Sequence, residues 1–246
     1  MEIKKYIKNI PESFRKFAEE VQSNSVTPPH SMYVVGSVLT PDYVPGGSDI
    51  NSLIVIEEHQ LDFLDFLILL GKEFKEHGIA PPLVMTAEYI DHSLDVFPIE
   101  FFNFQAIHHT LFGEDLLDRL QIGDQYLRLQ CEREIKAKLL WLGQVYIETL
   151  GDRNMLTEKL AVSITGYFPL FRAIIHLAGR DVPLGCSEVL QTLNETIGLE
   201  TDIFKSIHQM KTSGEQPAQR DELCSCFSSY YQATRDIAAY VDQLSC

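Results

Sequence analysis

The chain has 246 residues, of which 45% are hydrophobic and 22% charged, and it carries a formal net charge of −15 at pH 7. This composition excludes an intrinsically disordered protein, and the length allows one large or two modest globular domains. The acidic excess argues against a nucleic-acid partner and against an anionic membrane surface, because both are bound mainly through Lys and Arg.

The cysteines and the apolar segments indicate the compartment. There are five cysteines, an odd number, scattered without the spacing of a zinc site, so we expect neither that site nor a disulfide framework. Residues 1–8 lack the apolar core of a signal peptide. The apolar segment 63–70 is too short to span a membrane, and the segment 160–178 contains Pro169 and Arg172. We therefore expect a cytoplasmic protein without a membrane partner.

The first predicted elements are a helix and two strands. Pro11 suits a first helical turn, and the apolar residues that follow it recur on one helical face. The apolar run Tyr33–Val35 then ends at Gly36-Ser37, and a loop rich in Pro and Gly leads to a second apolar run over residues 52–56. This pattern predicts two strands joined by an exposed segment, followed by a helix over residues 61–77.

Polar residues gather where these two strands meet the loop. Gly36 allows a backbone to approach a phosphate closely, and free amide N–H groups there can hold an anion. Asp49 opens the second strand, and a carboxylate opposite the glycine can hold Mg²⁺. The structural alternative is an ordinary turn in which Asp49 caps a bend.

This arrangement resembles the nucleotidyltransferase superfamily of the polymerase beta type, which includes the aminoglycoside nucleotidyltransferases. Val35-Gly36-Ser37 fits the first half of the family motif, and Asp49-Ile50 fits the second. Asn51 departs from it, because the family usually has a second carboxylate there. The resemblance implies that Gly36 and Ser37 bind the phosphates of a nucleoside triphosphate, and that Asp49 and Asn51 are ligands of Mg²⁺ or Mn²⁺.

The family's third acidic residue is expected on a later strand. Residues 83–104 contain two apolar runs rich in β-branched and aromatic residues, which predict a strand that carries Asp95 and Glu100. These two residues would face opposite sides of one regular strand, so at most one belongs to the site unless Pro98 introduces a bend. We favour Glu100, as catalytic residue and metal ligand together with Asp49, because it begins the longer apolar stretch.

From about Gln121 the periodicity becomes helical. We expect a helix over residues 126–150, whose inward residues are Leu127, Ile135, Leu139, Leu142, Tyr146 and Leu150. A helix over 156–178 that Pro169 kinks should follow, with shorter helices further on. The predicted fold class is therefore α+β, with a small mixed-sheet nucleotidyltransferase domain over residues 1–120 and an all-helical bundle over residues 121–246. The adjacent His108 and His109 are expected to have surface or core roles, since neighbouring histidines poorly share one metal ion.

The resemblance implies an Mg²⁺-dependent transfer of a nucleoside monophosphate from a nucleoside triphosphate to a hydroxyl of a small molecule or protein. The alternative is a catalytically inactive protein of the same fold, acting as a nucleotide-binding regulator or an interaction module, because Asn51 removes a negative charge from the metal site. The sequence leaves the acceptor, the nucleotide base, the general base and the oligomeric state open.

Overall fold

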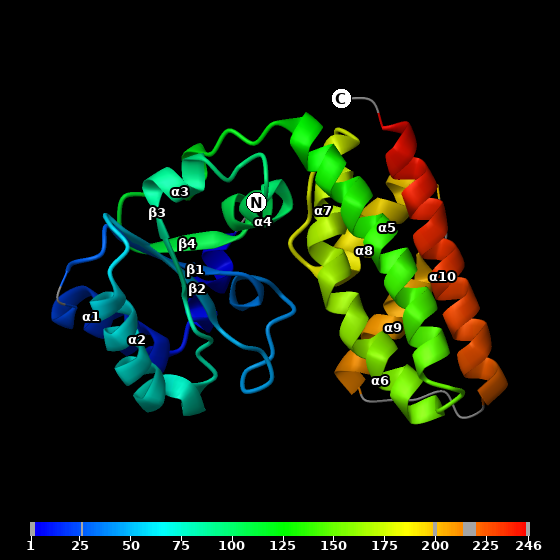
Figure 1. Ribbon diagram of the computed structural model, residues 1–246, viewed down its shortest axis with the longest axis horizontal. Coiled ribbons are helices and arrows are strands. Elements are labelled where there is room, and N and C mark those ends of the chain that lie inside the picture. Colours follow the sequence, from blue (N-terminus) through cyan, green and yellow to red (C-terminus); the bar gives the residue numbers. More distant parts are fainter. Residues whose placement is uncertain (1–2, 26, 199–200, 214–219, 245–246) are drawn as a thin grey trace. The chain divides into compact units, whose positions relative to one another are not determined.

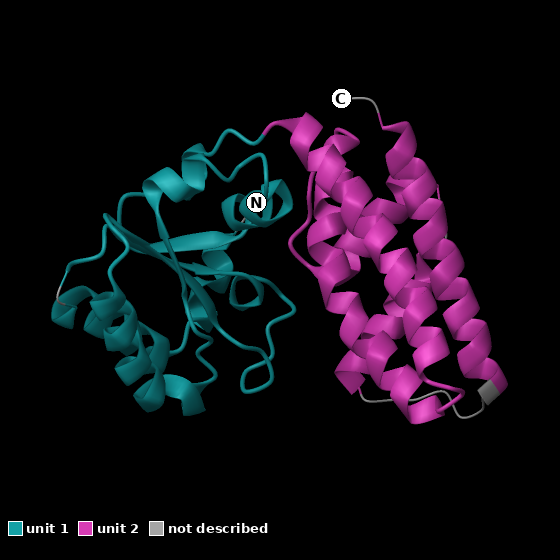
Figure 2. Ribbon diagram, in the orientation of Figure 1, with its two compact units in different colours: residues 1–122 teal, residues 123–246 magenta. Residues whose placement is uncertain are grey.

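A computed structural model describes residues 3–25, 27–198, 201–213 and 220–244. The chain divides into two compact units, residues 1–122 and residues 123–246 (Figure 2). The first is a mixed α/β unit and the second is helical, so the chain combines a small mixed sheet with a helical part (Figure 1).

Unit 1 contains four strands, four α-helices and four short 3₁₀ helices among its described residues. In chain order they are η1 (Ile3–Asn9), α1 (Glu12–Asn24), β1 (Ser31–Val35), η2 (Ser37–Leu39), β2 (Asn51–Ile56), α2 (Leu61–Phe74), η3 (Lys75–His77), β3 (Leu83–Thr86), α3 (Ala87–Asp91), α4 (Pro98–Ala106), β4 (His108–Gly113) and η4 (Leu117–Arg119).

The four strands form one sheet in the order β3-β2-β1-β4. The strand β1 pairs antiparallel with β2 on one side and with β4 on the other, while β2 and β3 run parallel. This confirms that residues 33–35 and 52–56 form neighbouring strands. Helices α1 and α2 lie on one side of the sheet and α3 and α4 on the other (Figure 1). Every residue of β1 is therefore buried, as expected for a strand covered on both faces.

The two faces of the sheet carry different apolar layers. On one face Tyr33, Val35, Leu53 and Val55 form a cluster with residues of α3, α4 and η4, including Phe101. Alternation along the strands places these side chains on a single face.

The helices α1 and α2 supply the other layer. The buried residues of α1 are those that recur on one helical face of the sequence, Phe14, Phe17, Ala18 and Val21. The ring of Phe17 contacts that of Phe74 edge to face, with 5.5 Å between centroids. The helical segment from Leu61 ends as predicted at Gly78, which caps it in the left-handed conformation with φ 69°.

The segment 83–104 differs from its prediction. Its first residues form β3, but residues 98–106 form the helix α4, so the expectation that Glu100 lies on a strand was wrong. Pro98 occupies the first turn of α4, where its missing N–H costs no hydrogen bond. The strand β4, which was not predicted, completes the sheet beside β1.

The described helices of unit 2 follow one another with short connections. They are α5 (Asp124–Glu148), α6 (Arg153–Ser163), η5 (Ile164–Tyr167), α7 (Phe168–Leu177), α8 (Cys186–Ile197), α9 (Asp202–Ser213) and α10 (Arg220–Gln243). The predicted single helix over residues 156–178 is thus divided by a 3₁₀ turn, and Pro169 lies in the first turn of α7 instead of inside a kinked helix.

The helical run Arg153–Leu177 is long and apolar enough to cross a membrane by length and hydropathy, but 56% of its most apolar window is buried inside the protein. Burial of this kind is what a core helix of a bundle requires. Tyr167 and Phe171 from this run contact Phe204 of α9, with ring centroids 5.4 and 5.0 Å away, and Tyr167 also contacts Tyr230 of α10. The run therefore forms the aromatic centre of unit 2.

The inward face of α5 was predicted only in part. Leu127, Ile135 and Leu142 are buried as expected. Tyr146 and Leu150 are instead 45% and 92% exposed. The helix ends before Leu150, which adopts a left-handed conformation with φ 47°, so the helical periodicity no longer applies to it.

Candidate functional site

The sheet register brings the predicted motif together at one end of the strands. Val35, the last residue of β1, pairs with Asn51, the first residue of β2, and on its other side with His108 of β4. Gly36 and Ser37 follow Val35 directly, and Asp49 precedes Asn51 on the same strand end. We call this group, Gly36, Ser37, Asp49 and Asn51, the Gly36 site.

Gly36 has a conformation that other residues rarely adopt. Its φ is 83° and its ψ is −150°, in a region populated almost only by glycine. A Cβ atom built on Gly36 would lie 3.8 Å from the side-chain Nδ2 of Asn51. The turn after β1 therefore lies close to the beginning of β2, and an amide side chain lies beside the glycine.

The backbone donors of this turn are not all available. The N–H of Gly36 donates a hydrogen bond to the carbonyl of Ile107 at 3.3 Å, so this amide is already engaged. The N–H groups of Ser37 and Val38 begin the 3₁₀ turn η2, where the first donors have no partner within the turn. Within the described chain the Ser37 hydroxyl makes no hydrogen bond. Val38 is fully buried, so Ser37 provides the donors that an anion could use.

Asp49 and Asn51 lie on the same side of their strand. Both are exposed, and Ile50 between them is buried. The backbone of Ile50 is fixed on both sides, because its N–H donates to Gly78 at 2.9 Å and its carbonyl accepts from Ala80 at 3.0 Å. Alternation along an extended chain then directs the Asp49 and Asn51 side chains to one side. A carboxylate and an amide oxygen so placed suit Mg²⁺, which retains several waters and prefers oxygen ligands.

The third predicted ligand is less well supported. Glu100 is exposed in the first turn of α4, and Asp95 is exposed in the turn between α3 and α4. Phe101 beside Glu100 packs on the sheet face that contains Val35 and Leu53. Because Asn51 lies on the same face as Leu53, α4 covers the face toward which Asn51 is directed. Among the residues that the structure describes, no three His, Cys, Asp or Glu side chains are grouped so that they could hold a metal ion.

His108 lies next to the Gly36 site but is fully engaged. Its Nδ1 lies 2.9 Å from the carbonyl of Phe104, and its Nε2 lies 3.0 Å from a carboxylate oxygen of Asp115. Both partners are hydrogen-bond acceptors, so both ring nitrogens are engaged within the protein. Burial acts to raise the pKa of Asp115, but the neighbouring His108 and the N–H of Asp118 outweigh this effect, and the pKa is lowered. His108 therefore has a structural role.

His109 is directed to the opposite sheet face, since neighbouring strand residues alternate. Burial and the nearby charge of Arg15 lower the pKa of His109. The two histidines cannot converge on one ion, which agrees with the structural roles expected for them.

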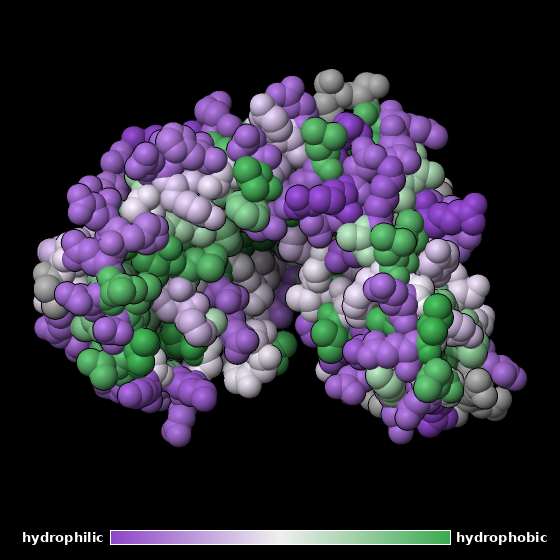
Figure 3. Space-filling model, in the orientation of Figure 1, coloured by the Kyte–Doolittle hydropathy of each residue, from purple (hydrophilic) through white to green (hydrophobic). Residues whose placement is uncertain are grey.

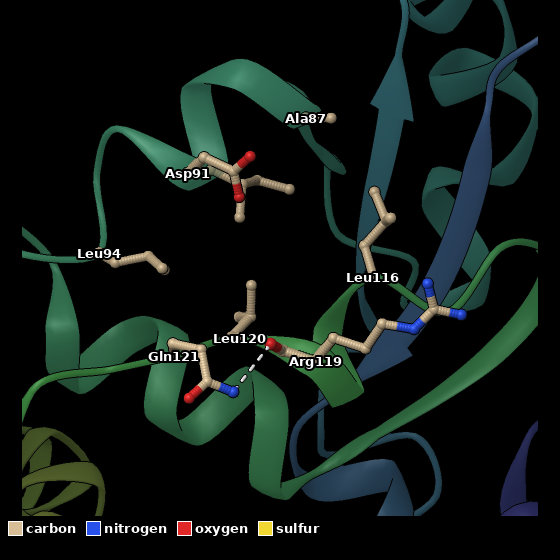
Figure 4. Close-up of a pocket in the computed structure, with 8 residues that line it drawn as sticks. Ala87, Asp91, Leu94, Leu116, Arg119, Leu120 and Gln121 are labelled. Atoms are coloured by element: carbon tan, nitrogen blue, oxygen red, sulfur yellow. Dashed lines mark hydrogen bonds between the residues drawn. The ribbon is translucent and has the colours of Figure 1, made fainter.

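A cavity of about 230 Å³ lies elsewhere in unit 1 (Figure 4). Asp91 and Gln121 line it on opposite sides, and Arg119 extends from η4 to form an ion pair with Glu114 at 2.5 Å. The cavity involves α3, which follows the Thr86 end of β3, and η4, which follows the Gly113 end of β4. By the strand register this is the opposite end of the sheet from Gly36. The cavity is therefore not part of the Gly36 site.

Comparison with protein-family models and with curated proteins gives no match for this chain.

Proposed function

We propose that the protein is a nucleotidyltransferase that transfers a nucleoside monophosphate from a nucleoside triphosphate to a hydroxyl of a small molecule or protein. The supporting observation is the juxtaposition of the Gly36 turn with Asn51, on the strand end that also carries Asp49. A glycine turn beside an exposed acidic strand end combines donors for phosphate oxygens with ligands for their counter-ion.

Each residue has a role in this proposal. The hydroxyl and the N–H of Ser37, in the turn that Gly36 begins, would bind the terminal phosphates. Asp49 and Asn51 would hold Mg²⁺ or Mn²⁺, and Glu100 is the proposed third ligand. When bound, the ion would offset charge that develops on the phosphate oxygens. The acceptor oxygen would form a bond to the α-phosphorus, the bond to the bridging oxygen would break, pyrophosphate would leave, and the hydroxyl proton would pass to a base.

A second candidate is a nucleotide-binding regulator without transferase activity. Asn51 supplies an amide where a carboxylate would hold a hard cation more strongly, and the described residues contain no group of three His, Cys, Asp or Glu side chains that could hold a metal ion. This candidate shares the nucleotide site with the first and differs only in the chemical step.

The test is calorimetry of ATP binding with and without Mg²⁺, for the wild type, Asn51→Asp and Asp49→Ala. We expect Mg²⁺-dependent binding that Asn51→Asp strengthens and Asp49→Ala weakens, each by roughly tenfold, about 1.4 kcal/mol. Glu100→Gln and Asp95→Asn form a matched pair, of which only the first should weaken the Mg²⁺ dependence.

Pyrophosphate release separates the two candidates. Release in the presence of candidate hydroxyl acceptors supports the transferase, whereas nucleotide binding without release under the same conditions supports the regulator. Equal, metal-independent binding in the wild type and in both Gly36-site variants would contradict both candidates.

A further inference from the structure

The Gly36 site has no basic residue of its own. No Lys or Arg occurs in the sequence between Lys16 and Lys72, a segment that includes β1, β2 and the loop between them. A triphosphate carries more negative charge than one Mg²⁺ ion neutralises, and the carboxylate of Asp49 and the net charge of −15 add to the repulsion. A triphosphate held at Ser37 therefore needs cations from another part of the chain.

The 3₁₀ helix η1 brings three lysines to this end of the sheet. Lys4, Lys5 and Lys8 all belong to η1, and all three are exposed. Within the described parts of the chain, neither Lys4 nor Lys8 forms an ion pair. The helix packs against β4 and against η2, and Nη2 of Arg15 donates a hydrogen bond to the carbonyl of Ile7 at 3.3 Å. The lysines are thus carried by a segment whose backbone is fixed from two directions.

A direct hydrogen bond joins η1 to the turn that contains Ser37. The side-chain Nδ2 of Asn9 donates to the carbonyl of Val38 at 3.2 Å. Lys8 precedes Asn9 in the chain, and Ser37 precedes Val38. Lys8 and Ser37 are therefore the immediate chain neighbours of two residues in contact. The long, flexible stem of a lysine can bring its ammonium group to a phosphate bound at such a neighbouring position.

The strand order places the lysines and the metal ligands on different sides of Ser37. The strand β1, which leads into Gly36 and Ser37, lies between β2 and β4. Asp49 and Asn51 belong to the β2 side, whereas η1 packs against β4. A polyphosphate at Ser37 would consequently have Mg²⁺ on one side and ammonium groups on the other.

The next two lysines in the chain have a different environment. Lys72 and Lys75 line an apolar groove between α2 and the segment 79–82. Hydrophobic side chains gather over α2 in the space-filling view (Figure 3). The stem of a lysine covers apolar surface of this kind while its ammonium group stays in water. Packing on the groove accounts for Lys72 and Lys75, whereas Lys8 lies beside the Gly36 site.

We propose that η1 is a polyphosphate-binding segment, in which Lys8, assisted by Lys4 and Lys5, binds the terminal phosphates of a nucleoside triphosphate held at Ser37. The inference rests on the nucleotide site proposed above and supplies the cations that this site lacks. A lysine binds phosphate as a point charge, without a fixed geometry, so the ligand is recognised by its charge. Inorganic tripolyphosphate is therefore a sufficient probe, beside ATP itself.

Calorimetry of the full chain with tripolyphosphate and with ATP, each with and without Mg²⁺, tests the proposal. We expect Lys8→Gln to raise the dissociation constant of both ligands by about threefold, and the combined variant Lys4→Gln, Lys5→Gln, Lys8→Gln to raise it by about tenfold. Lys8→Arg keeps the charge and should bind like the wild type. The effect of the combined variant should shrink as the salt concentration rises, because salt screens exposed charges.

Arg119→Gln is the matched control. It also removes one positive charge from an exposed side chain of unit 1, but Arg119 lies in η4, at the opposite end of the sheet. This variant should bind tripolyphosphate and ATP like the wild type. Because all the substituted side chains are exposed, every variant should keep the wild-type circular dichroism spectrum.

The outcomes separate this inference from the proposed function. Mg²⁺-dependent ATP binding that is equal in the wild type and the combined lysine variant would overturn the inference and leave the proposed function standing. An equal loss in Arg119→Gln and Lys8→Gln would also overturn it, since any positive charge would then serve. Binding of tripolyphosphate that Lys8→Gln weakens, but that neither Mg²⁺ nor Asp49→Ala affects, would support the inference and contradict the proposed function. A wild type that binds neither ligand would contradict both.

Discussion

At the scale of single residues, Gly36 determines how close the first turn can come to the second strand. Its φ of 83° with ψ of −150° is accessible to glycine at little cost, whereas an L-residue there is strained by about 1–3 kcal/mol. We predict that Gly36→Ala lowers the free energy of unfolding by that amount, measured by denaturant titration. Gly143→Ala is the matched control in α5, where open space surrounds the new methyl group and helix propensity favours Ala by about 0.5–1 kcal/mol. Equal effects of the two substitutions would contradict the conformational argument.

The pair His108–Asp115 leads to a prediction about pH. The pKa of Asp115 is lowered in the folded protein. A lowered carboxyl pKa stabilises the fold above the unfolded value, about 3.9, and this contribution is lost as the pH falls through the folded value. The Asp115 side chain is 42% exposed, so the contribution at neutral pH is small, within about 1 kcal/mol.

We therefore predict that Asp115→Asn is less stable than the wild type at neutral pH and that the difference shrinks below about pH 4. Urea unfolding at several pH values measures this. An unchanged difference at low pH would mean that the amide disrupts packing instead of removing a charge.

At the scale of elements, secondary structure is predicted best where the apolar residues recur with a single helical or strand period. The face of α1 with Phe14 and Phe17 is clear because four apolar residues recur at helical spacing. The strands β1 and β2 are bounded by Gly36 and the Pro-rich loop. The helix α4 was mistaken for a strand because aromatic residues favour strands, although Pro98 is also typical of a first helical turn.

The candidate site was likewise predictable in one part and not in another. The meeting of Gly36 with Asn51 was predictable from two strands and one loop, because a connection between adjacent strands returns to the same end of the sheet. The position of Glu100 was not, since it depends on how α4 packs over the sheet through Phe101. Such a contact between distant segments leaves no periodic signal in the sequence.

The end of α5 supplies a prediction at this scale. Leu150 adopts φ of 47°, and its side chain is 92% exposed. Its backbone is therefore strained, while its side chain buries almost no apolar surface. We predict that Leu150→Asn raises the free energy of unfolding by about 1 kcal/mol, because Asn tolerates the left-handed conformation. Ile147→Asn, at a 73% exposed residue inside the helix, is the matched control and should give no gain. Thermal unfolding followed by circular dichroism compares the two.

At the scale of the whole molecule, each compact unit has its own buried core. In unit 2 the core contains Phe204 and Tyr230, both 0% exposed. We predict that a fragment of residues 123–246 folds alone, with a helical circular dichroism spectrum and a cooperative thermal transition. Phe204→Ala should lower the transition temperature strongly, since removing a buried Phe ring costs about 3–5 kcal/mol. A gradual transition in the unmodified fragment would show that unit 2 depends on unit 1.

The sheet order has a consequence for synthesis on the ribosome. The central strand β1 pairs with β2 soon after both emerge, but its other side pairs with β4, which begins at His108. Between the emergence of Ile56 and that of His108 the nascent chain carries β1 with one side unpaired. Translation adds about 5–20 residues per second, so this interval lasts roughly 3–10 s. During that time an apolar strand that is fully buried in the finished protein can pair with other chains. The same exposed strand is a binding target for a chaperone near the ribosomal exit.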